Sequence, residues 1–253
     1  MSTTPAHREL PRSDGVRFPA RFLLRRFRPL GRWVIRRRFA VRLHGTEHVP
    51  TRGSVIFASN HIGVSDGPLL AIFAPRSVHA LTKLEMFEGR LGLLLRATGQ
   101  IPLDRFRADP AAVRSCLRVL RDGGAVGIYP EGRRGSGDLE RFHRGAAYFA
   151  LVSGAPVVPV IMLGTRDPGG RSGSLPPRGG VVDIVFGPPI TLEKSPWPRT
   201  KEQVERSSML LREQMLVHLD HARASTGREL PGPLPPNDVE PDPATGVPER
   251  GAP

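Results

Sequence analysis

Cysteine and lysine are scarce in this sequence. Cys116 is the only cysteine, so the chain cannot form an intramolecular disulfide, and a reducing compartment is the expected setting. Without a cysteine pair or an H-E-x-x-H motif there is no zinc site of a recognised spacing, and we expect no metal. Only 3 of the 37 basic residues are lysines, so arginine carries almost all of the positive charge.

Long apolar runs are also missing. No uninterrupted apolar segment approaches the roughly 18 residues of a membrane-spanning helix. The first residues lack the apolar middle region of a secretory signal, and together with the single cysteine this predicts a cytoplasmic protein. The 253 residues, 39% of them hydrophobic, are enough for one ordinary domain with a substantial core.

Acidic residues are absent from residues 16–46, which contain ten arginines. The whole chain has a formal charge of +13 and a pI near 11.3. This excess indicates a phosphate-bearing partner, either lipid or nucleic acid. The sequence has no recognisable nucleic-acid-binding module, and apolar residues are interleaved with the arginines. A lipid surface is therefore favoured, and nucleic acid is not an expected partner.

Residues 17–39 have the pattern of a basic amphipathic segment. Pro29 and Gly31 predict that it breaks into two short helices. Such helices lie in a membrane interface, helped by about 1 kcal/mol per arginine near anionic lipid. The alternative is a solvated helix whose apolar side packs on the main domain, and the two interpretations are compatible. The apolar residues near helical spacing are Phe18, Phe22, Leu23, Phe27, Leu30, Val34 and Ile35.

Strands and helices alternate from about residue 40 onward, which predicts an α/β domain over residues 40–225. The clearest helix follows Asp109, its expected N-cap, and places Cys116 on a buried face as an inert core residue. Residues 1–15 and the proline-rich residues 226–253 are expected to be disordered. Strands are predicted near residues 40–45, 54–59, 78–83, 125–130, 156–163 and 181–187, and helices after Asp66 and over 88–99, 110–122, 143–153 and 201–223.

His61 and Asp66 stand between a predicted strand and a predicted helix, in "SNHIGVSDGPLL" at residues 59–70. Along one helix, five residues would turn their side chains about 140° apart. They can meet only if His61 lies in the turn and Asp66 in the first helical turn. An imidazole oriented by a carboxylate is a general-base pair. The alternative is a histidine that caps a turn next to an ordinary helix-start aspartate, and the spacing alone does not decide.

Two further stretches carry arginines at turns. "YPEGRRGSG" at residues 129–137 places one carboxylate and two guanidiniums after a buried strand, without the pattern of a nucleotide-binding loop. Guanidinium groups suit phosphate, although a solvated charged hairpin is an equal alternative. "GQIPLDR" at residues 99–105 ends in another arginine and is a weak signal by itself. No G-x-S-x-G elbow is present, so a histidine base would act on a hydroxyl of the substrate.

Taken in order, four stretches resemble the motifs of the glycerophospholipid acyltransferase family, whose best-known members are the 1-acylglycerol-3-phosphate acyltransferases. "NHIGVSD", "GQIPLDR", "YPEGRRGS" and "APVVPV" are similar to its N-H-x-S-x-x-D, G-x-I/F-x-x-R, F-P-E-G-T-R-S and V-P-x-V-P-V motifs. The resemblance covers residues 40–190. It implies a mixed central sheet flanked by helices.

The resemblance also implies roles for individual residues. His61 would be the general base and Asp66 its orienting partner. The residues implied to bind the glycerol phosphate are Arg105, Glu131, Gly132, Arg133 and Arg134. Two positions depart from the family pattern: Gly63 stands where serine is usual, and Arg133 stands where threonine is usual.

The implied reaction moves a fatty acyl group from a thioester to the free hydroxyl of a lysophospholipid, most simply 1-acylglycerol-3-phosphate, to give phosphatidic acid. Acyl-CoA or acyl carrier protein would be the co-substrate, and no cofactor is expected. The expected location is peripheral, on an anionic membrane surface at the inner face of the plasma membrane. The alternatives are an acyltransferase for another lysolipid or alcohol, and a lipid-binding homologue without turnover.

Overall fold

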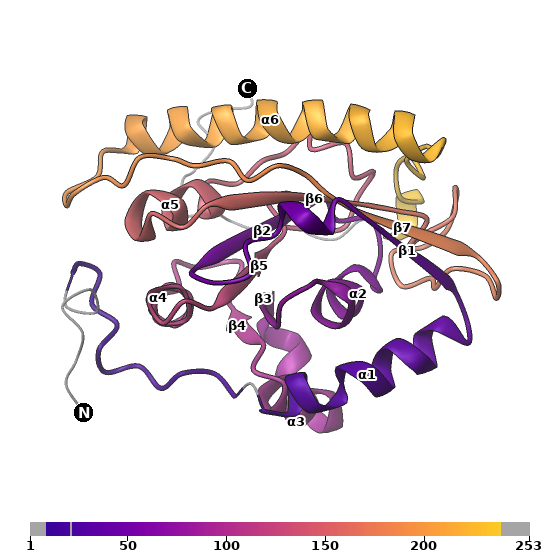
Figure 1. Cartoon of the computed structure of the whole chain (residues 1–253), viewed down its shortest axis with the longest axis horizontal. Coiled ribbons are helices and arrows are strands. Elements are labelled where there is room, and N and C mark those ends of the chain that lie inside the picture. Colours follow the sequence, from indigo (N-terminus) through magenta and orange to yellow (C-terminus); the bar gives the residue numbers. More distant parts are fainter. Residues whose placement is uncertain (1–8, 21, 239–253) are drawn as a thin grey trace.

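The computed structural model describes residues 9–20 and 22–238, which form a mixed sheet of seven strands in the order β1-β7-β6-β2-β5-β3-β4 (Figure 1). Strands β2 to β6 are parallel to one another, while β7 pairs antiparallel with β6 and parallel with β1. The prediction of a mixed central sheet is confirmed. The strands are β1 (Ala40–His44), β2 (Val55–Ser59), β3 (Val78–Lys83), β4 (Ile101–Leu103), β5 (Ala125–Ile128), β6 (Val157–Leu163) and β7 (Val181–Phe186).

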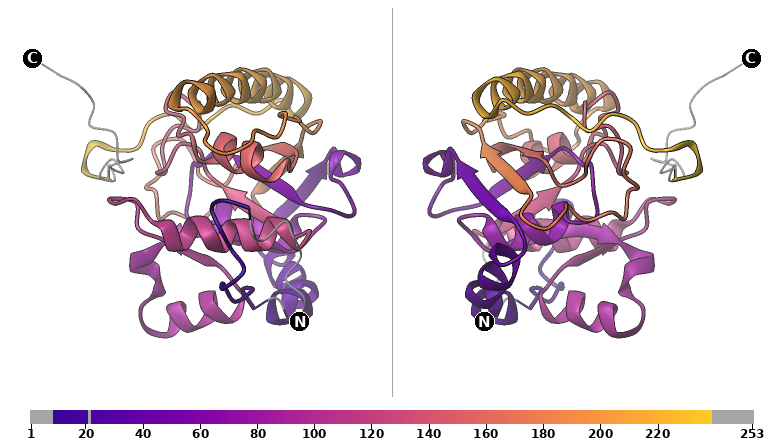
Figure 2. Two further views of the ribbon diagram at one scale, coloured as in Figure 1. Left: turned by 90° about the vertical axis from the view of Figure 1, so that its left-hand side faces the viewer. Right: turned by 90° about the vertical axis from the view of Figure 1, so that its right-hand side faces the viewer.

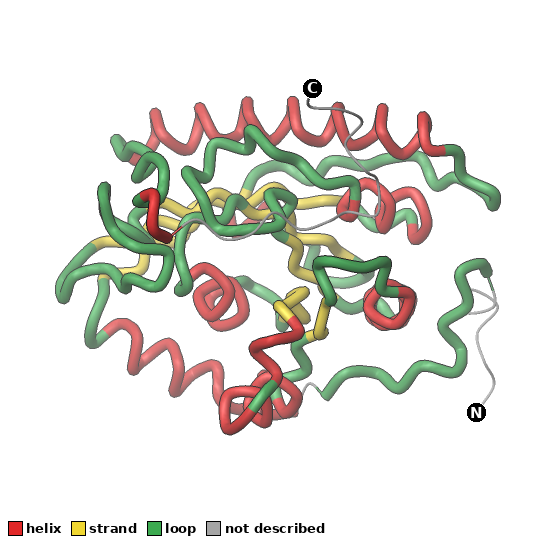
Figure 3. Tube along the Cα trace, turned by 180° about the vertical axis from the view of Figure 1, so that it is seen from behind, coloured by secondary structure: helices red, strands yellow, loops and turns green. Residues whose placement is uncertain are grey.

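Helices cover both faces of the sheet, as the view from behind in Figure 3 also shows. Helices α4 (Pro110–Arg121), α5 (Gly145–Ser153) and α6 (Lys201–Thr226) share one apolar face with the sheet. Helix α2 (Asp66–Phe73) packs on the other face, with α1 (Phe22–Arg36) outside it. The short η3 (Leu84–Phe87) and α3 (Gly89–Ala97) follow β3, and single turns η2 (Thr46–His48) and η4 (Pro236–Asp238) complete the elements.

The central strands are apolar on both sides because helices cover both faces. In β2, Phe57 packs in the cluster under α2, whereas Ile56 and Ala58 pack in the cluster under α4 and α5. All five residues of β2 are buried. This explains why the strand is a continuous apolar run rather than an alternating one.

Helix α1 corrects the prediction of two short helices. It is continuous from residue 22 to residue 36 with Pro29 inside it. Arg28 and Arg32 both donate from Nε to the Ile72 carbonyl, at 3.2 and 2.9 Å, and so satisfy the C-terminal end of α2. Burial lowers the pKa of Arg28 to about 10, which leaves it charged at neutral pH. Because contacts from both sides of Pro29 hold α1 against α2, the proline does not divide the helix.

Helix α4 begins as predicted. The Asp109 side chain accepts hydrogen bonds from the backbone N–H groups of Ala111 and Ala112, at 3.0 and 2.9 Å. Cys116 is fully buried on the core side of the helix, and burial raises the pKa of its thiol well above the ordinary value. The assignment of this cysteine to the core is confirmed.

Parts of the two terminal segments that were expected to be disordered are described by the structure and make hydrogen bonds to the domain. Arg121 donates to the Pro11 carbonyl and to the Ser13 hydroxyl, both at 2.9 Å, which fixes part of residues 9–15. At the other end, the Gly232 carbonyl accepts a 2.6 Å hydrogen bond from Arg166, which fixes part of residues 226–238. Residues 1–8 and 239–253, also expected to be disordered, lie outside the described residues.

Candidate functional site

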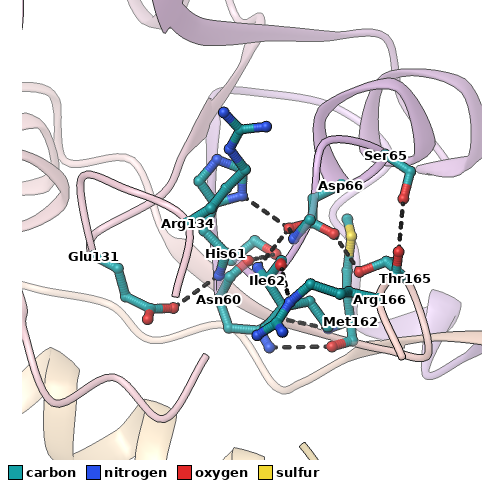
Figure 4. A network of polar contacts seen from close by, with 12 residues as sticks. Asn60, His61, Ile62, Ser65, Asp66, Glu131, Arg134, Met162, Thr165 and Arg166 are labelled. Carbon is teal, nitrogen blue, oxygen red and sulfur yellow. Dashed lines mark hydrogen bonds and ion pairs between the residues drawn. The ribbon is translucent and has the colours of Figure 1, made fainter. Parts of the chain in front are cut away.

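Three parallel strands bring the candidate site together, because their carboxyl ends meet at one edge of the sheet. Strand β2 lies between β6 and β5. His61 follows β2, Glu131 follows β5 and Thr165 follows β6. The close view in Figure 4 shows that these side chains converge on the loop between β2 and α2. Ligands of open α/β sheets commonly bind at this edge.

The structure brings His61 and Asp66 into contact. His61 Nδ1 lies 2.8 Å from Asp66 Oδ2. Residues 60–65 form the turn, and Asp66 is the first residue of α2, so the pair has the arrangement that strand–turn–helix reasoning required. The Asp66 side chain is fully buried, whereas 15% of the His61 side chain is exposed. The imidazole therefore reaches the surface of the site while its partner does not.

Asp66 is held by donors on both oxygens. Oδ2 accepts from the backbone N–H groups of Ile62 and Gly63 at 2.7 and 2.9 Å, in addition to His61. Oδ1 accepts from the Thr165 hydroxyl at 2.5 Å. These four donors fix the position of the carboxylate. Since a carboxylate only accepts, His61 carries its proton on Nδ1 and presents Nε2 as the basic nitrogen.

Glu131 contacts the backbone of His61. Its Oε1 accepts a 2.7 Å hydrogen bond from the His61 N–H, and only 5% of the residue is exposed. Burial is the main cause that raises the Glu131 pKa to about 8. Tyr129 precedes the same turn, and its ring stacks on the imidazole with centroids 4.2 Å apart. Glu131 and Tyr129 thus fix the backbone and the ring plane of His61.

The arginines expected to bind phosphate lie around one turn. Arg105, which follows β4, donates from Nη1 to the Gly132 carbonyl at 3.4 Å, so the second and third motifs are neighbours in space. Arg134 donates to the Ser172 carbonyl at 3.1 Å. The Gly135 N–H donates to the His61 carbonyl at 2.9 Å, which joins this turn to the histidine loop. Arg133 is half-buried in the same turn.

Arg166 was missed by the sequence analysis, where it falls between the strands predicted near residues 156–163 and 181–187. It is 2% exposed and donates to the carbonyls of Ile62, Gly135 and Gly170, at 2.8, 2.9 and 2.9 Å. It also bonds the Gly232 carbonyl in the C-terminal segment. This single guanidinium connects the loops after β2, β5 and β6. An arginine three residues after a long apolar strand was the available signal.

Asn60 and Thr165 were missed as well. The Asn60 amide accepts from the Met162 N–H at 2.8 Å and donates to the Met162 carbonyl at 3.1 Å, which continues the pairing of β2 with β6. The Thr165 hydroxyl donates to Asp66 close to Gly63. At the position of Gly63 the glycerophospholipid acyltransferase family usually has serine. A Cβ at Gly63 would lie 3.1 Å from the Thr165 carbonyl oxygen, so even a small side chain would be tight there. Ser65 donates to the same carbonyl at 3.3 Å.

Comparisons with known proteins agree with this architecture. The family model described as Acyltransferase matches residues 40–163. The 1-acyl-sn-glycerol-3-phosphate acyltransferase of Bacillus subtilis (strain 168) is 28% identical over 159 residues, which span 62% of this chain and 77% of that protein. A protein of the same name from Borreliella burgdorferi is 31% identical over 132 residues, 49% of this chain and 51% of that protein.

A solved structure shows the same fold. The crystal structure of the 1-acyl-sn-glycerophosphate (LPA) acyltransferase PlsC from Thermotoga maritima superposes with a TM-score of 0.58 and 22% sequence identity. The match covers 78% of this chain and 80% of that chain. At this identity the likeness concerns the fold alone.

Replacing Thr165 tests the support of Asp66. Thr165→Val keeps the shape but leaves Oδ1 of a buried carboxylate without its hydroxyl donor, so the free energy of unfolding should fall by about 1.5–3 kcal/mol. Thr165→Ser keeps a hydroxyl and should lose less. Denaturant unfolding of the three proteins measures the difference. Equal stability of the valine and wild-type proteins would contradict the proposed support.

The raised pKa of Glu131 predicts that the free energy of unfolding depends on pH. Its pKa is about 8 in the folded protein and near 4.5 when unperturbed, so the unfolded chain releases this proton first as the pH rises. The wild-type protein should therefore lose stability relative to Glu131→Gln from about pH 4.5 to pH 8, since each pKa unit corresponds to about 1.4 kcal/mol. Unfolding both proteins across this range measures it. A difference that does not change with pH would contradict the raised pKa.

Proposed function

We propose that this chain, whose residues 40–163 match the acyltransferase family model, acylates the free hydroxyl of 1-acylglycerol-3-phosphate to give phosphatidic acid. The acyl donor is a thioester, either acyl-CoA or acyl carrier protein, and the reaction uses no cofactor. The observation that carries the proposal is the 2.8 Å contact between His61 Nδ1 and Asp66, next to a turn that contains Arg133 and Arg134. The acceptor is inferred from the names of the relatives, and the reaction type is inferred from the His61–Asp66 pair.

His61 acts as the general base in this proposal. Its Nε2 takes the proton of the acceptor hydroxyl while the oxygen attacks the thioester carbonyl carbon. When the tetrahedral intermediate collapses, the C–S bond breaks and the imidazolium returns the proton to the thiolate. Ester and free thiol leave, and no acyl-enzyme forms. A positioned base contributes about 10²–10⁴-fold, and the alignment of two bound substrates contributes further.

The acceptor phosphate binds to the guanidiniums of Arg105, Arg133 and Arg134 around the Gly132 turn. Guanidinium forks match phosphate oxygens in pairs, which fixes the orientation of the glycerol as well as its charge. Glu131 belongs to this site as a positioning residue, because its carboxyl group contacts the His61 N–H. Arg133 adds a positive charge where the family usually has threonine.

Helix α1 holds the enzyme on an anionic membrane. Its residues Leu24, Arg28 and Arg32 contact the domain, and at about 100° per residue they lie opposite its apolar arc. That arc faces outward and is exposed by 52–74%; its members are Phe22, Phe27, Leu30, Trp33 and Val34. The opposite side of α1 packs on the domain through Leu24 and Ile35, so the membrane contact and the packing contact occupy different sides of the helix. None of the described helices is long and apolar enough to cross a membrane, and we propose peripheral attachment at the inner face of the plasma membrane.

Thiol release tests the reaction directly. The purified protein should release free thiol from acyl-CoA when 1-acylglycerol-3-phosphate is added, with phosphatidic acid as the product. His61→Ala should lower this rate by at least about 10²-fold because the base is lost. His221→Ala, an exposed histidine on α6, is the matched control and should leave the rate unchanged. Full activity of the His61 variant would remove it from the base role, and no thiol release with any lysolipid or alcohol acceptor would indicate a lipid-binding protein without turnover.

Arg134→Ala tests the phosphate assignment. The apparent KM for the acceptor should rise about tenfold or more, with a smaller change in kcat, because the lost contact is made in the ground state as well. Arg206→Ala on α6 is the control for a general loss of positive charge. Unchanged acceptor kinetics in the Arg134 variant would contradict its role.

Two substitutions on α1 test the membrane contact. Phe27→Gln with Trp33→Gln removes two exposed apolar side chains without touching the contacts to α2, so binding to vesicles that contain phosphatidylglycerol should weaken by roughly tenfold or more. Met209→Gln with Val217→Gln makes the same change on exposed residues of α6. Vesicle sedimentation compares the two double variants. Equal binding by both would reject α1 as the attachment site.

A further inference from the structure

Four exposed leucines gather on η3 and α3, outside every segment that the sequence assigned to the membrane. Leu84, Leu91, Leu93 and Leu94, here called the leucine patch, are exposed by 48, 47, 68 and 57%. We propose that the leucine patch is a second membrane contact, which enters the same bilayer as α1 and brings the acceptor-binding arginines to the lipid surface. The reference to acceptor binding rests on the proposed function.

The packing of α3 fixes the outward direction of these leucines. At about 100° per residue, Leu91, Leu93 and Leu94 fall within an arc of about 160°. Gly92 lies opposite that arc and packs its backbone on η3, where an added Cβ would stand 2.1 Å from the Phe87 carbonyl oxygen. Phe87 itself is 4% exposed. Because only glycine permits this close approach, α3 cannot turn its leucines inward without breaking the contact.

The leucine patch and α1 lie on the same side of the protein. Figure 1 and both views of Figure 2 show α1 and α3 at the edge opposite α6. The segment that leads into α1 touches the chain just after α3, since a Cβ on Gly99 would stand 2.0 Å from the Ala20 carbonyl oxygen. One surface can therefore meet both elements at once.

The side chains on this side of the protein favour a lipid surface as the partner. Exposed apolar residues of both helices gather on this side, and such clusters mark protein or membrane interaction sites. Arginines accompany them, with no acidic residue in α1 and with Arg90 and Arg96 beside the leucines of α3. Such cations suit the phosphates of anionic lipid. The leucines of α3 project outward from a helix at the periphery of the protein. Such a surface suits a bilayer, whereas a site for a single acyl chain would enclose the chain in a tunnel.

The leucine patch also adjoins the candidate site. Glu85 of η3 lies 3.9 Å from Arg105, one of the proposed phosphate ligands. Phe106 follows that arginine and is 41% exposed, with the guanidinium carbon 5.4 Å from its ring centroid. Insertion of the patch would place Arg105 at the depth of the lipid headgroups. A lysolipid could then present its phosphate to Arg105 while its acyl chain stayed in the bilayer.

A single fluorescent label tests the insertion. Cys116 is fully buried, so a thiol-reactive probe sensitive to polarity will label an introduced cysteine selectively in the folded protein. The label on Leu93→Cys should shift to the blue on vesicles of phosphatidylcholine with phosphatidylglycerol, as should one on Phe27→Cys. Val217→Cys, on an α6 residue that is 67% exposed, should not shift. A shift at position 27 without one at position 93 would overturn the proposal.

Turnover separates a bilayer contact from an acyl-chain site. Leu93→Gln with Leu94→Gln should lower vesicle binding roughly tenfold. It should also slow the acylation of a long-chain lysolipid in vesicles, and leave the acylation of a short-chain lysolipid dissolved as monomers unchanged. An equal loss on the dissolved acceptor would overturn the proposal in favour of an acyl-chain site. If wild-type protein acylates no acceptor, the proposed function fails, while the label at position 93 still decides whether the patch enters the bilayer.

Discussion

The buried carboxylate of Asp66 is the point on which the site depends. Its two oxygens accept from His61, from the N–H groups of Ile62 and Gly63, and from Thr165. A fully buried charge is costly unless such donors surround it. The same contacts set the turn, the tautomer of the imidazole and the distance from β6. Stability and the proposed chemistry therefore rest on one set of hydrogen bonds, which explains why the loop after β6 belongs to the site.

The order of the strands in the sheet brings segments that are far apart in the sequence together in one site. Asp66 and Thr165 are 99 residues apart, and Ile62 and Arg166 are 104 residues apart, yet both pairs are bonded because β2 and β6 are neighbours. Arg166 then ties the loops after β2, β5 and β6 to one guanidinium. Outside this centre, α1 and α3 turn apolar residues toward solvent on a common side. The protein thus combines a hydrogen-bonded candidate site at one edge of the sheet with exposed apolar residues on α1 and α3.

Most of the fold was predictable from the sequence because buried strands and capped helices leave local patterns. The Asp109 cap and the strand–turn–helix setting of His61 and Asp66 are of this kind, and both were found. The helix break expected at Pro29 is absent, since the contacts between α1 and α2 that hold the helix are long-range. The contacts of the described terminal segments leave no local pattern, because Pro11 and Gly232 are held through carbonyl oxygens, which every residue carries. Thr165 was missed because its role requires the pairing of β2 with β6.

Nitrogen-15 NMR of the His61 imidazole tests the central claim most directly. The signal can be assigned by comparison with His61→Gln, and it should be recorded at a pH where the ring is neutral. If Asp66 orients the ring, the proton resides on Nδ1 and Nε2 is the unprotonated nitrogen, as a base for the acceptor hydroxyl requires. A neutral ring that carries its proton on Nε2 would contradict the account, because no basic nitrogen would then face the substrate.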